Sequence, residues 1–171
     1  MKTNEQKPMK AETKPDKNKI RLWSALGIVS TLVILGAILF LAKSQNMVNA
    51  VAITVYKSPS CNCCNKWVDH LHDAGFSVTT KNTSDMDYIK LISGVKPVLQ
   101  SCHTALVGGY VVEGHVPAAD IKRLLQERPP VSGLTVPGMP LGSPGMEGPY
   151  KDSYDVLTFD QNGRTQVYAS Y

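Results

Sequence analysis

The chain has 171 residues, of which 18 are Lys or Arg and 14 are Asp or Glu, so its formal net charge is +4. That excess lies entirely before residue 22, where seven basic residues stand against three acidic ones, and the rest of the chain has 11 of each sign. A nucleic-acid-binding domain carries a basic face of its own. We therefore expect no nucleic-acid partner, and we interpret the Lys- and Pro-rich residues 1–21 as a disordered basic tail.

Residues 22–42 contain no charged side chain and are rich in Leu, Ile, Val and Ala. A helix of about 20 such residues crosses a hydrocarbon core of about 30 Å. We interpret the segment as a single transmembrane anchor, followed by a linker over residues 43–50. A cleaved signal peptide is the alternative, because Val48-Asn49-Ala50 resembles a cleavage site, although the apolar core of a signal peptide typically has only about 7–15 residues.

The charge of the tail predicts the orientation of this anchor. Basic residues that flank a transmembrane helix stay on the cytoplasmic side. The N-terminus is therefore expected in the cytoplasm, with residues 51–171 on the periplasmic side of the inner membrane.

Residues 51–171 are enough for one domain. Hydrophobic periodicity and turn residues predict its elements, and Ser84-Asp85 is the expected cap of the second helix. In chain order the expected elements are strand 51–56, helix 64–74, strand 76–80, helix 86–94, strands 104–107 and 110–113, a helix from Pro117 through Leu125, and strands 155–159 and 165–168. The order is βαβαββα with an added C-terminal hairpin over residues 154–169, after a Pro/Gly/Met-rich loop at residues 129–149.

The four cysteines are grouped in a way that predicts chemistry. Three of them occur in Cys61-Asn62-Cys63-Cys64, between the first strand and the first helix, and the fourth is Cys102. Vicinal cysteines do not easily bridge each other. Thiols at a helix N-terminus have a lowered pKa, which makes them available as nucleophiles or ligands. Soft-metal binding, redox exchange, or both are the expected functions, with Cys61 and Cys64 as the redox candidates.

This order of elements, with cysteines between the first strand and first helix, resembles the thioredoxin-like fold. That resemblance implies a cis-proline in the loop before the third strand, where this chain instead has Ser101-Cys102-His103-Thr104. The missing proline argues against a thiol-disulfide oxidoreductase. The cysteine and histidine in its place favour a metal site to which Cys102 contributes a fourth thiol.

A closer resemblance is to the CopG-like family, which is associated with copper and heavy-metal resistance in bacterial envelopes. It covers residues 51–171 and is carried by segments 56–64, 101–105, 113–121, 136–140 and 142–147. The resemblance implies that Cys61, Cys63, Cys64 and Cys102 are the metal ligands. Asn62 stands where a glycine is common in the family, and this departure leaves every thiol in place.

The chemistry of the thiols suggests which metal they bind. Thiolates select Cu(I) and Zn(II), and a structural zinc site usually uses separated pairs of ligands. Adjacent Cys63 and Cys64 fit bridging of several Cu(I) ions better, so copper is our first hypothesis and Zn(II) the alternative. A Cys61 to Cys64 disulfide would exclude the metal, which predicts a redox-gated site.

Four other side chains are weaker candidates. His103 is a ligand, an outer donor or an ordinary polar loop residue, and His115 has a packing role as its alternative. Met139 and Met146 could pass Cu(I) inward or anchor their loop apolarly. His70 and His72 lie on different faces of the first helix and are expected to be solvated.

Three function classes remain open from the sequence. The leading one is a membrane-anchored copper-binding protein of the envelope, with copper-handling proteins or a thiol reductant as partners. The second is a thioredoxin-like oxidoreductase that acts on envelope proteins. The third is an anchored interaction domain stapled by two disulfides.

Overall fold

The computed structural model describes residues 51–171, which belong to the second of the chain's two compact units, Ala50–Tyr171. The basic tail, the anchor and the linker predicted within residues 1–50 lie outside the described residues. Within the described part, no helix combines the length and the apolar character that crossing a membrane requires.

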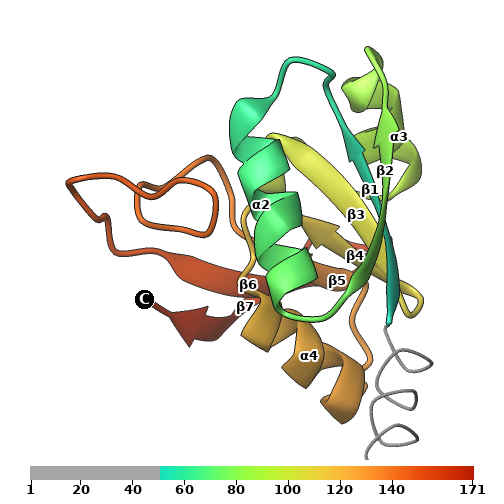
Figure 1. Cartoon of the computed structure of the whole chain (residues 1–171). Coiled ribbons are helices and arrows are strands. Elements are labelled where there is room, and N and C mark those ends of the chain that lie inside the picture. Colours follow the sequence, from blue (N-terminus) through green and yellow to red (C-terminus); the bar gives the residue numbers. More distant parts are fainter. Residues whose placement is uncertain (1–50) are drawn as a thin grey trace, which may run out of the picture. The chain divides into compact units, whose positions relative to one another are not determined.

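The described residues form a mixed α/β structure with one seven-stranded sheet and three α-helices (Figure 1). The elements are β1 (Ala52–Lys57), α2 (Asn62–Asp73), β2 (Ser77–Asn82), α3 (Met86–Ile92), the short 3-10 helix η1 (Pro97–Leu99), β3 (His103–Val107), β4 (Tyr110–Glu113), α4 (Ala118–Glu127), β5 (Gly133–Thr135), β6 (Asp155–Phe159) and β7 (Thr165–Ser170). Apart from η1 and β5, this is the predicted order, and the predicted C-terminal hairpin is confirmed as β6 and β7.

The pairing of strands brings the distant cysteine to the other three. The sheet order is β2-β1-β3-β4-β5-β6-β7, in which β1 is parallel to β2 and antiparallel to β3. The last residue of β1, Lys57, is therefore opposite the first residue of β3, His103. The cysteine motif follows β1 and Cys102 immediately precedes β3, so both lie at the same end of these neighbouring strands.

Helix α2 packs on the sheet through an apolar face. Its buried residues are Cys64, Trp67, Val68 and Leu71, which recur at the three-to-four spacing of a helix face. The indole Nε1 of Trp67 donates a 2.9 Å hydrogen bond to the carbonyl oxygen of Val116. Burying one such large apolar side chain contributes about 1.5–3 kcal/mol, so apolar packing fixes the helix that begins at the cysteine motif.

Helix α3 has the predicted N-cap but not the expected apolar face. Asp85 accepts a 3.1 Å hydrogen bond from the backbone N–H of Tyr88, as predicted for a cap. The apolar residues Leu91 and Ile92 are 74% and 62% exposed, and the buried residue of this helix is Lys90. The reason is an ion pair between Lys90 and Glu113, described below, which takes the inward-facing position.

The expectation that His70 is solvated was wrong. Its Nε2 accepts a 3.0 Å hydrogen bond from the backbone N–H of Ala118, the first residue of α4, whereas His72 is exposed as expected. Helix α4 follows Pro117 and has no side-chain cap from its own N-cap position. The imidazole of His70 therefore satisfies one of the amides that a helix N-terminus leaves free.

Strand β5 was not predicted because it has only three residues and lies in the Pro/Gly-rich segment. It pairs in parallel with β4 and antiparallel with β6. A Cβ at Gly133 would lie 1.8 Å from the carbonyl oxygen of Val111, so only glycine allows the two backbones to approach this closely. The short strand thus joins the predicted hairpin to the rest of the sheet.

Candidate metal centre

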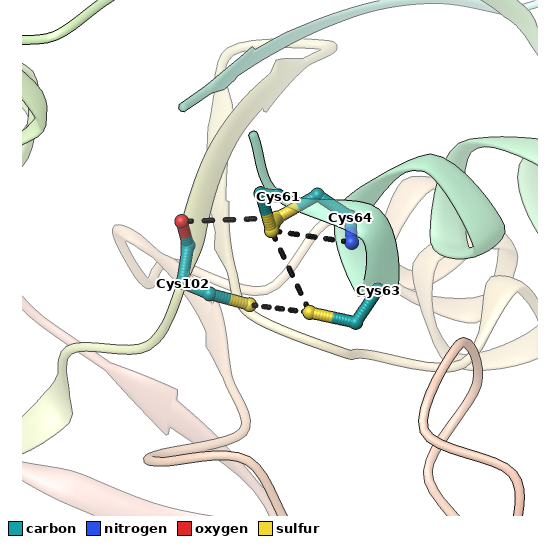
Figure 2. Close-up of side chains that lie close together, drawn as sticks. All are labelled: Cys61, Cys63, Cys64 and Cys102. Carbon is teal, nitrogen blue, oxygen red and sulfur yellow. Dashed lines mark hydrogen bonds between the residues drawn. A yellow bond between two sulfur atoms is a disulfide. The ribbon is translucent and has the colours of Figure 1, made fainter. Parts of the chain in front are cut away.

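The three cysteines of the motif lie at the N-terminal end of α2. Cys61 is the N-cap residue, and its Sγ accepts a 3.3 Å hydrogen bond from the backbone N–H of Cys64. Cys61 and Cys64 form a disulfide, with their Cα atoms 5.3 Å apart (Figure 2). Cys63 and Cys102 are free thiols and are both partly exposed. The structure therefore contains one bonded pair and one free pair of cysteines.

The sulfur atoms of all four cysteines lie within 4.8 Å of one another. Cys63 Sγ is 3.5 Å from Cys61 Sγ and 3.9 Å from Cys102 Sγ (Figure 2). Two thiolates bound to one tetrahedral ion with bonds of about 2.3 Å have sulfur atoms roughly 3.8 Å apart. These separations and the soft donors fit Cu(I) or Zn(II) once the Cys61 to Cys64 disulfide is reduced.

A buried carboxylate binds residues on both sides of Cys102. Glu113 is fully buried and accepts hydrogen bonds of 2.7 Å from the backbone N–H of Ser101 and from the hydroxyl of Thr104. Its charge is paired with Lys90 Nζ at 2.5 Å, and Lys90 is only 4% exposed. Burial raises the pKa of Glu113, and the Lys90 ammonium opposes that rise. Cys102 is therefore held by an ionic network rather than by apolar packing.

Nothing in the sequence pointed to this network. Lys90 and Glu113 lie 23 positions apart in different elements, and a single charged residue in a short helix or strand usually faces solvent. The β3 and β4 pairing could have placed Glu113 opposite Thr104. The partner Lys90 had no detectable signal, because α3 was expected to bury its apolar residues.

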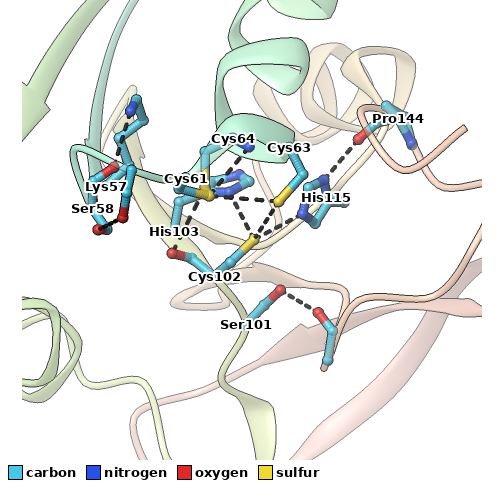
Figure 3. The surroundings of a disulfide bond; sticks show 12 residues. Lys57, Ser58, Cys61, Cys63, Cys64, Ser101, Cys102, His103, His115 and Pro144 are labelled. Atoms are coloured by element: carbon cyan, nitrogen blue, oxygen red, sulfur yellow. Dashed lines mark hydrogen bonds between the residues drawn. A yellow bond between two sulfur atoms is a disulfide. The ribbon is translucent and has the colours of Figure 1, made fainter.

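His115 is oriented toward Cys102 (Figure 3). Its Nδ1 lies 2.7 Å from the carbonyl oxygen of Pro144, and a carbonyl only accepts, so Nδ1 carries the proton. The other nitrogen, Nε2, lies 2.8 Å from Cys102 Sγ. Burial lowers the pKa of His115 and so favours the neutral ring, in which Nε2 has a free lone pair. A neutral imidazole with one nitrogen fixed in this way can act as a ligand or accept the thiol proton.

His103 is fully buried beneath the cysteines. Its ring lies against Trp67, with ring centroids 4.2 Å apart, and its Nδ1 is 3.4 Å from Cys102 Sγ. Burial, followed by the charges of His115 and Lys90, lowers the pKa of His103. Among residues 51–171, its Nε2 has no hydrogen-bond partner. Cys102, His103 and His115 thus form a second group of donor atoms within 4.8 Å of one another, which shares Cys102 with the sulfur cluster.

Comparisons with known proteins show the family of this chain. A family model described as a protein of unknown function, DUF411, matches residues 99–146. Two solved structures titled copper resistance protein CopG, forms 2 and 1, are each 45% identical to this chain, with TM-scores of 0.69 and 0.68. Each match covers 72% of this chain, with 99% and 98% of the solved chains covered. The chain belongs to the CopG family. No curated protein matches.

Residues 99–146, the range of the family model, take in one side of the CopG site. They include Cys102, both buried histidines and the two candidate methionines, and they begin after the cysteine motif. The site therefore has two parts. One lies within the range of the family model, and the other, the cysteine motif at the start of α2, lies before that range.

The loop between β5 and β6 lies against the cysteines of this CopG-family chain (Figure 3). The hydroxyl of Ser101 donates to the carbonyl oxygen of Gly138, whose own N–H donates to Gln100 at 3.1 Å. A Cβ at Gly145 would come within 2.7 Å of the Cys63 carbonyl oxygen. The backbone of this loop is thus fixed beside both Cys102 and Cys63.

The candidate methionines both lie in this loop. Met139 is 53% exposed, and Met146 is partly buried next to Gly145. The loop places the Pro144 carbonyl beside His115 and Gly145 beside Cys63, and the role of the two methionines stays a prediction. Glu147, which the sequence did not single out, accepts a 2.7 Å hydrogen bond from the backbone N–H of Gly145, and this bond lowers the pKa of Glu147.

Proposed function

We propose that this protein binds Cu(I) through Cys61, Cys63, Cys64 and Cys102 as part of bacterial copper resistance. The observation that carries the proposal is the gathering of four sulfur atoms within 4.8 Å in a chain of the CopG family. Thiolates prefer Cu(I) among the ions of a bacterial envelope, and Zn(II) is the alternative. Copper is the cargo of the site, rather than a resident cofactor.

The adjacency of Cys63 and Cys64 supports more than one copper ion per chain. Adjacent thiolates have little freedom to close one tetrahedron together, but they can bind different ions and share them as bridges. His115 Nε2 lies 2.8 Å from Cys102 Sγ, which supports a role for His115 as a further ligand or as the acceptor of the Cys102 proton. His103 is in second place, because its nearest sulfur contact is longer, at 3.4 Å.

The Cys61 to Cys64 disulfide supports redox gating of copper binding. When two thiols form a disulfide they release two protons and two electrons, which is enough to reduce two Cu(II) ions to Cu(I). The disulfide also removes two of the four thiolates from the site. The reduced protein is then the copper-binding form, and the oxidised protein the releasing form.

The proposal includes a fold assignment and a location. The order β2-β1-β3-β4, with the cysteines between β1 and α2, supports a thioredoxin-like domain to which β5, β6 and β7 are added. The uncharged residues 22–42 support an anchor in the inner membrane, with this domain in the periplasm. Copper-handling proteins or a thiol reductant of the envelope would be its partners.

An anaerobic Cu(I) titration tests the copper proposal. The full-length chain in detergent, reduced beforehand, competes with a Cu(I)-specific chelator while native mass spectrometry counts the bound ions. We expect several Cu(I) ions per chain, and loss of most of them in Cys63→Ser and Cys102→Ser. His72→Gln changes an exposed histidine of the same helix and should bind like the native protein. Failure of the native chain to compete with the chelator would contradict copper binding.

A second function, as a thiol-disulfide oxidoreductase, is favoured by the Cys61 to Cys64 disulfide. It predicts that the reduced, metal-free protein reduces disulfides of other proteins, with Cys61→Ser and Cys64→Ser inactive. An insulin reduction assay measures this activity. Turnover in that assay without Cu(I) binding in the titration would make the oxidoreductase the better assignment.

A further inference from the structure

Cys63 lies between the bonded and the free sulfurs of the cluster. Its Sγ is 3.5 Å from Cys61 Sγ, which belongs to the disulfide, and 3.9 Å from Cys102 Sγ, which is the other free thiol (Figure 2). Non-bonded sulfurs at these separations are close to contact. Cys63 is thus the sulfur through which the two pairs can exchange.

We propose that Cys63 and Cys102 form a second disulfide pair, and that the disulfide moves between Cys61–Cys64 and Cys63–Cys102 through Cys63. This inference deepens the redox gating proposed above. It rests on the same cysteine cluster, but it does not depend on copper, because thiol-disulfide exchange takes place in the metal-free protein.

The first step is attack of the Cys63 thiolate on Cys61 Sγ. The Cys61 to Cys63 bond forms, the Cys61 to Cys64 bond breaks, and Cys64 leaves as a thiolate that takes up the proton lost by Cys63.

In the second step, Cys102 gives its thiol proton to His115 Nε2, which lies 2.8 Å from Cys102 Sγ, and then attacks Cys63 Sγ. The Cys63 to Cys102 bond forms, the Cys61 to Cys63 bond breaks, and Cys61 leaves as a thiolate that takes up the proton lost by Cys102. The two steps together move one disulfide and transfer no net electrons or protons. No oxidant or reductant is needed, because every electron and proton stays within the chain.

Cys63 and Cys102 are placed so that their sulfurs can form a bond. Cys63 and Cys102 are both partly exposed, whereas Cys64 is fully buried. To form a bond, their sulfurs must approach from 3.9 Å to about 2.05 Å, and the two residues lie in elements that are already in contact. Each isomer leaves a different pair of thiols unbonded: Cys63 and Cys102 in the first isomer, and Cys61 and Cys64 in the second.

Tryptic peptides allow the two isomers to be distinguished. The three cysteines of the motif fall within one peptide, residues 58–66, and Cys102 falls within residues 91–122, because Lys96 precedes Pro97 and is not cleaved. A Cys61–Cys64 disulfide stays within the first peptide. A disulfide to Cys102 joins the two peptides, and reduction separates them again.

The experiment starts from the full-length, metal-free, reduced chain in detergent. One molar equivalent of diamide converts one dithiol per chain to a disulfide and takes up the two hydrogens. The protein is then incubated without oxygen, quenched in acid, alkylated and digested, and only the monomer is analysed. The same procedure is applied to Cys63→Ser, which keeps Cys61, Cys64 and Cys102.

We expect both the internal disulfide and the joined peptides in the native protein, and complete loss of the joined peptides in Cys63→Ser. If Cys102 in the native protein is fully alkylated and no joined peptide forms, the proposal is overturned. Joined peptides that persist in Cys63→Ser overturn it as well, because Cys102 would then pair directly with Cys61 or Cys64. Since no metal is present, these outcomes are independent of the copper titration.

Discussion

The helices α2 and α3 each follow a strand of the same sheet, but α2 buries apolar side chains and α3 buries a charged one. Helix α2 buries Trp67, Val68 and Leu71, while α3 buries Lys90 and leaves Leu91 and Ile92 exposed. Helix α2 starts at the cysteine motif, and Lys90 of α3 leads through Glu113 to the backbone beside Cys102. The two sides of one cysteine cluster are therefore positioned by different forces, the first by apolar packing and the second by a buried ion pair.

The two sides of the cluster should therefore respond differently to substitution. Apolar packing tolerates exchange between side chains of similar volume. A buried ion pair tolerates little, because removing one partner leaves the other charge without compensation. Variants on the two sides of the cluster should therefore differ in how much stability they lose.

Glu113→Ala should have the largest effect, destabilising the protein by about 3–5 kcal/mol. The substitution leaves Lys90 buried without its counter-charge and leaves the N–H of Ser101 without its acceptor. Urea denaturation measures the change. The double variant Lys90→Met, Glu113→Leu should recover part of the loss, since no unpaired charge remains. Equal destabilisation of the single and double variants would show that the ion pair is not what holds this side.

Leu71→Ala should destabilise the protein by about 2–5 kcal/mol, because it removes most of a fully buried side chain of α2 and leaves a cavity in its place. The matched change on the other helix, Leu91→Ala, should stay within about 0.5 kcal/mol, because Leu91 is 74% exposed. The same urea titrations compare the two. Similar effects at both positions would mean that α3 packs through its apolar residues after all.

Gly145→Ala should cost about 1–3 kcal/mol and weaken Cu(I) binding. Gly145 has a φ of +85°, and a Cβ there would meet the Cys63 carbonyl oxygen at 2.7 Å and the Trp67 backbone nitrogen at 2.9 Å. Gly148→Ala is the control in the same loop, because a Cβ there has nothing within 4 Å. Thermal unfolding and the chelator competition measure both variants. If Gly145→Ala behaves like Gly148→Ala, the loop does not press on the first turn of α2.

Copper affinity should rise with pH. Burial, followed by the neighbouring Cys63 thiol, raises the pKa of Cys102 to about 12, so the metal must displace a proton at neutral pH. Below that pKa, each displaced proton raises the apparent affinity about tenfold per pH unit. Chelator competition at several pH values between about 6 and 9 measures the slope. Cys102→Ser should lower the slope by one proton, and an unchanged slope would place the displaced proton elsewhere.

The sequence predicted those parts of the structure that depend on local patterns. The strand before the motif, the Asp85 cap and the hairpin around Gly163 follow from short-range periodicity, capping and turn chemistry. The gathering of Cys102 with the motif was predicted from a resemblance in topology. The pairing of β1 with β3 supplies its physical basis.

The parts that the sequence did not predict depend on contacts between distant residues. Two such contacts are the ion pair of Lys90 with Glu113 and the hydrogen bond from Ala118 to His70. Each joins different elements, and neither produces a repeating pattern in the sequence. The orientation of His115 depends on the carbonyl of Pro144, 29 positions away. A sequence pattern identifies such residues as candidates, but their partners determine what each nitrogen can do.

The hydrogen bond from Ala118 to His70 has a mechanical consequence. Helix α4 follows His115 by two residues and depends on an imidazole of α2 to satisfy its first amide. The N–H of Ala118 donates to Nε2 of His70, and burial lowers the pKa of His70, which favours the unprotonated acceptor. This hydrogen bond therefore joins the helix that begins at the cysteine motif to the first residue of the helix that follows His115. The two sides of the cysteine cluster are thus linked by a direct contact between helices as well as through the sheet.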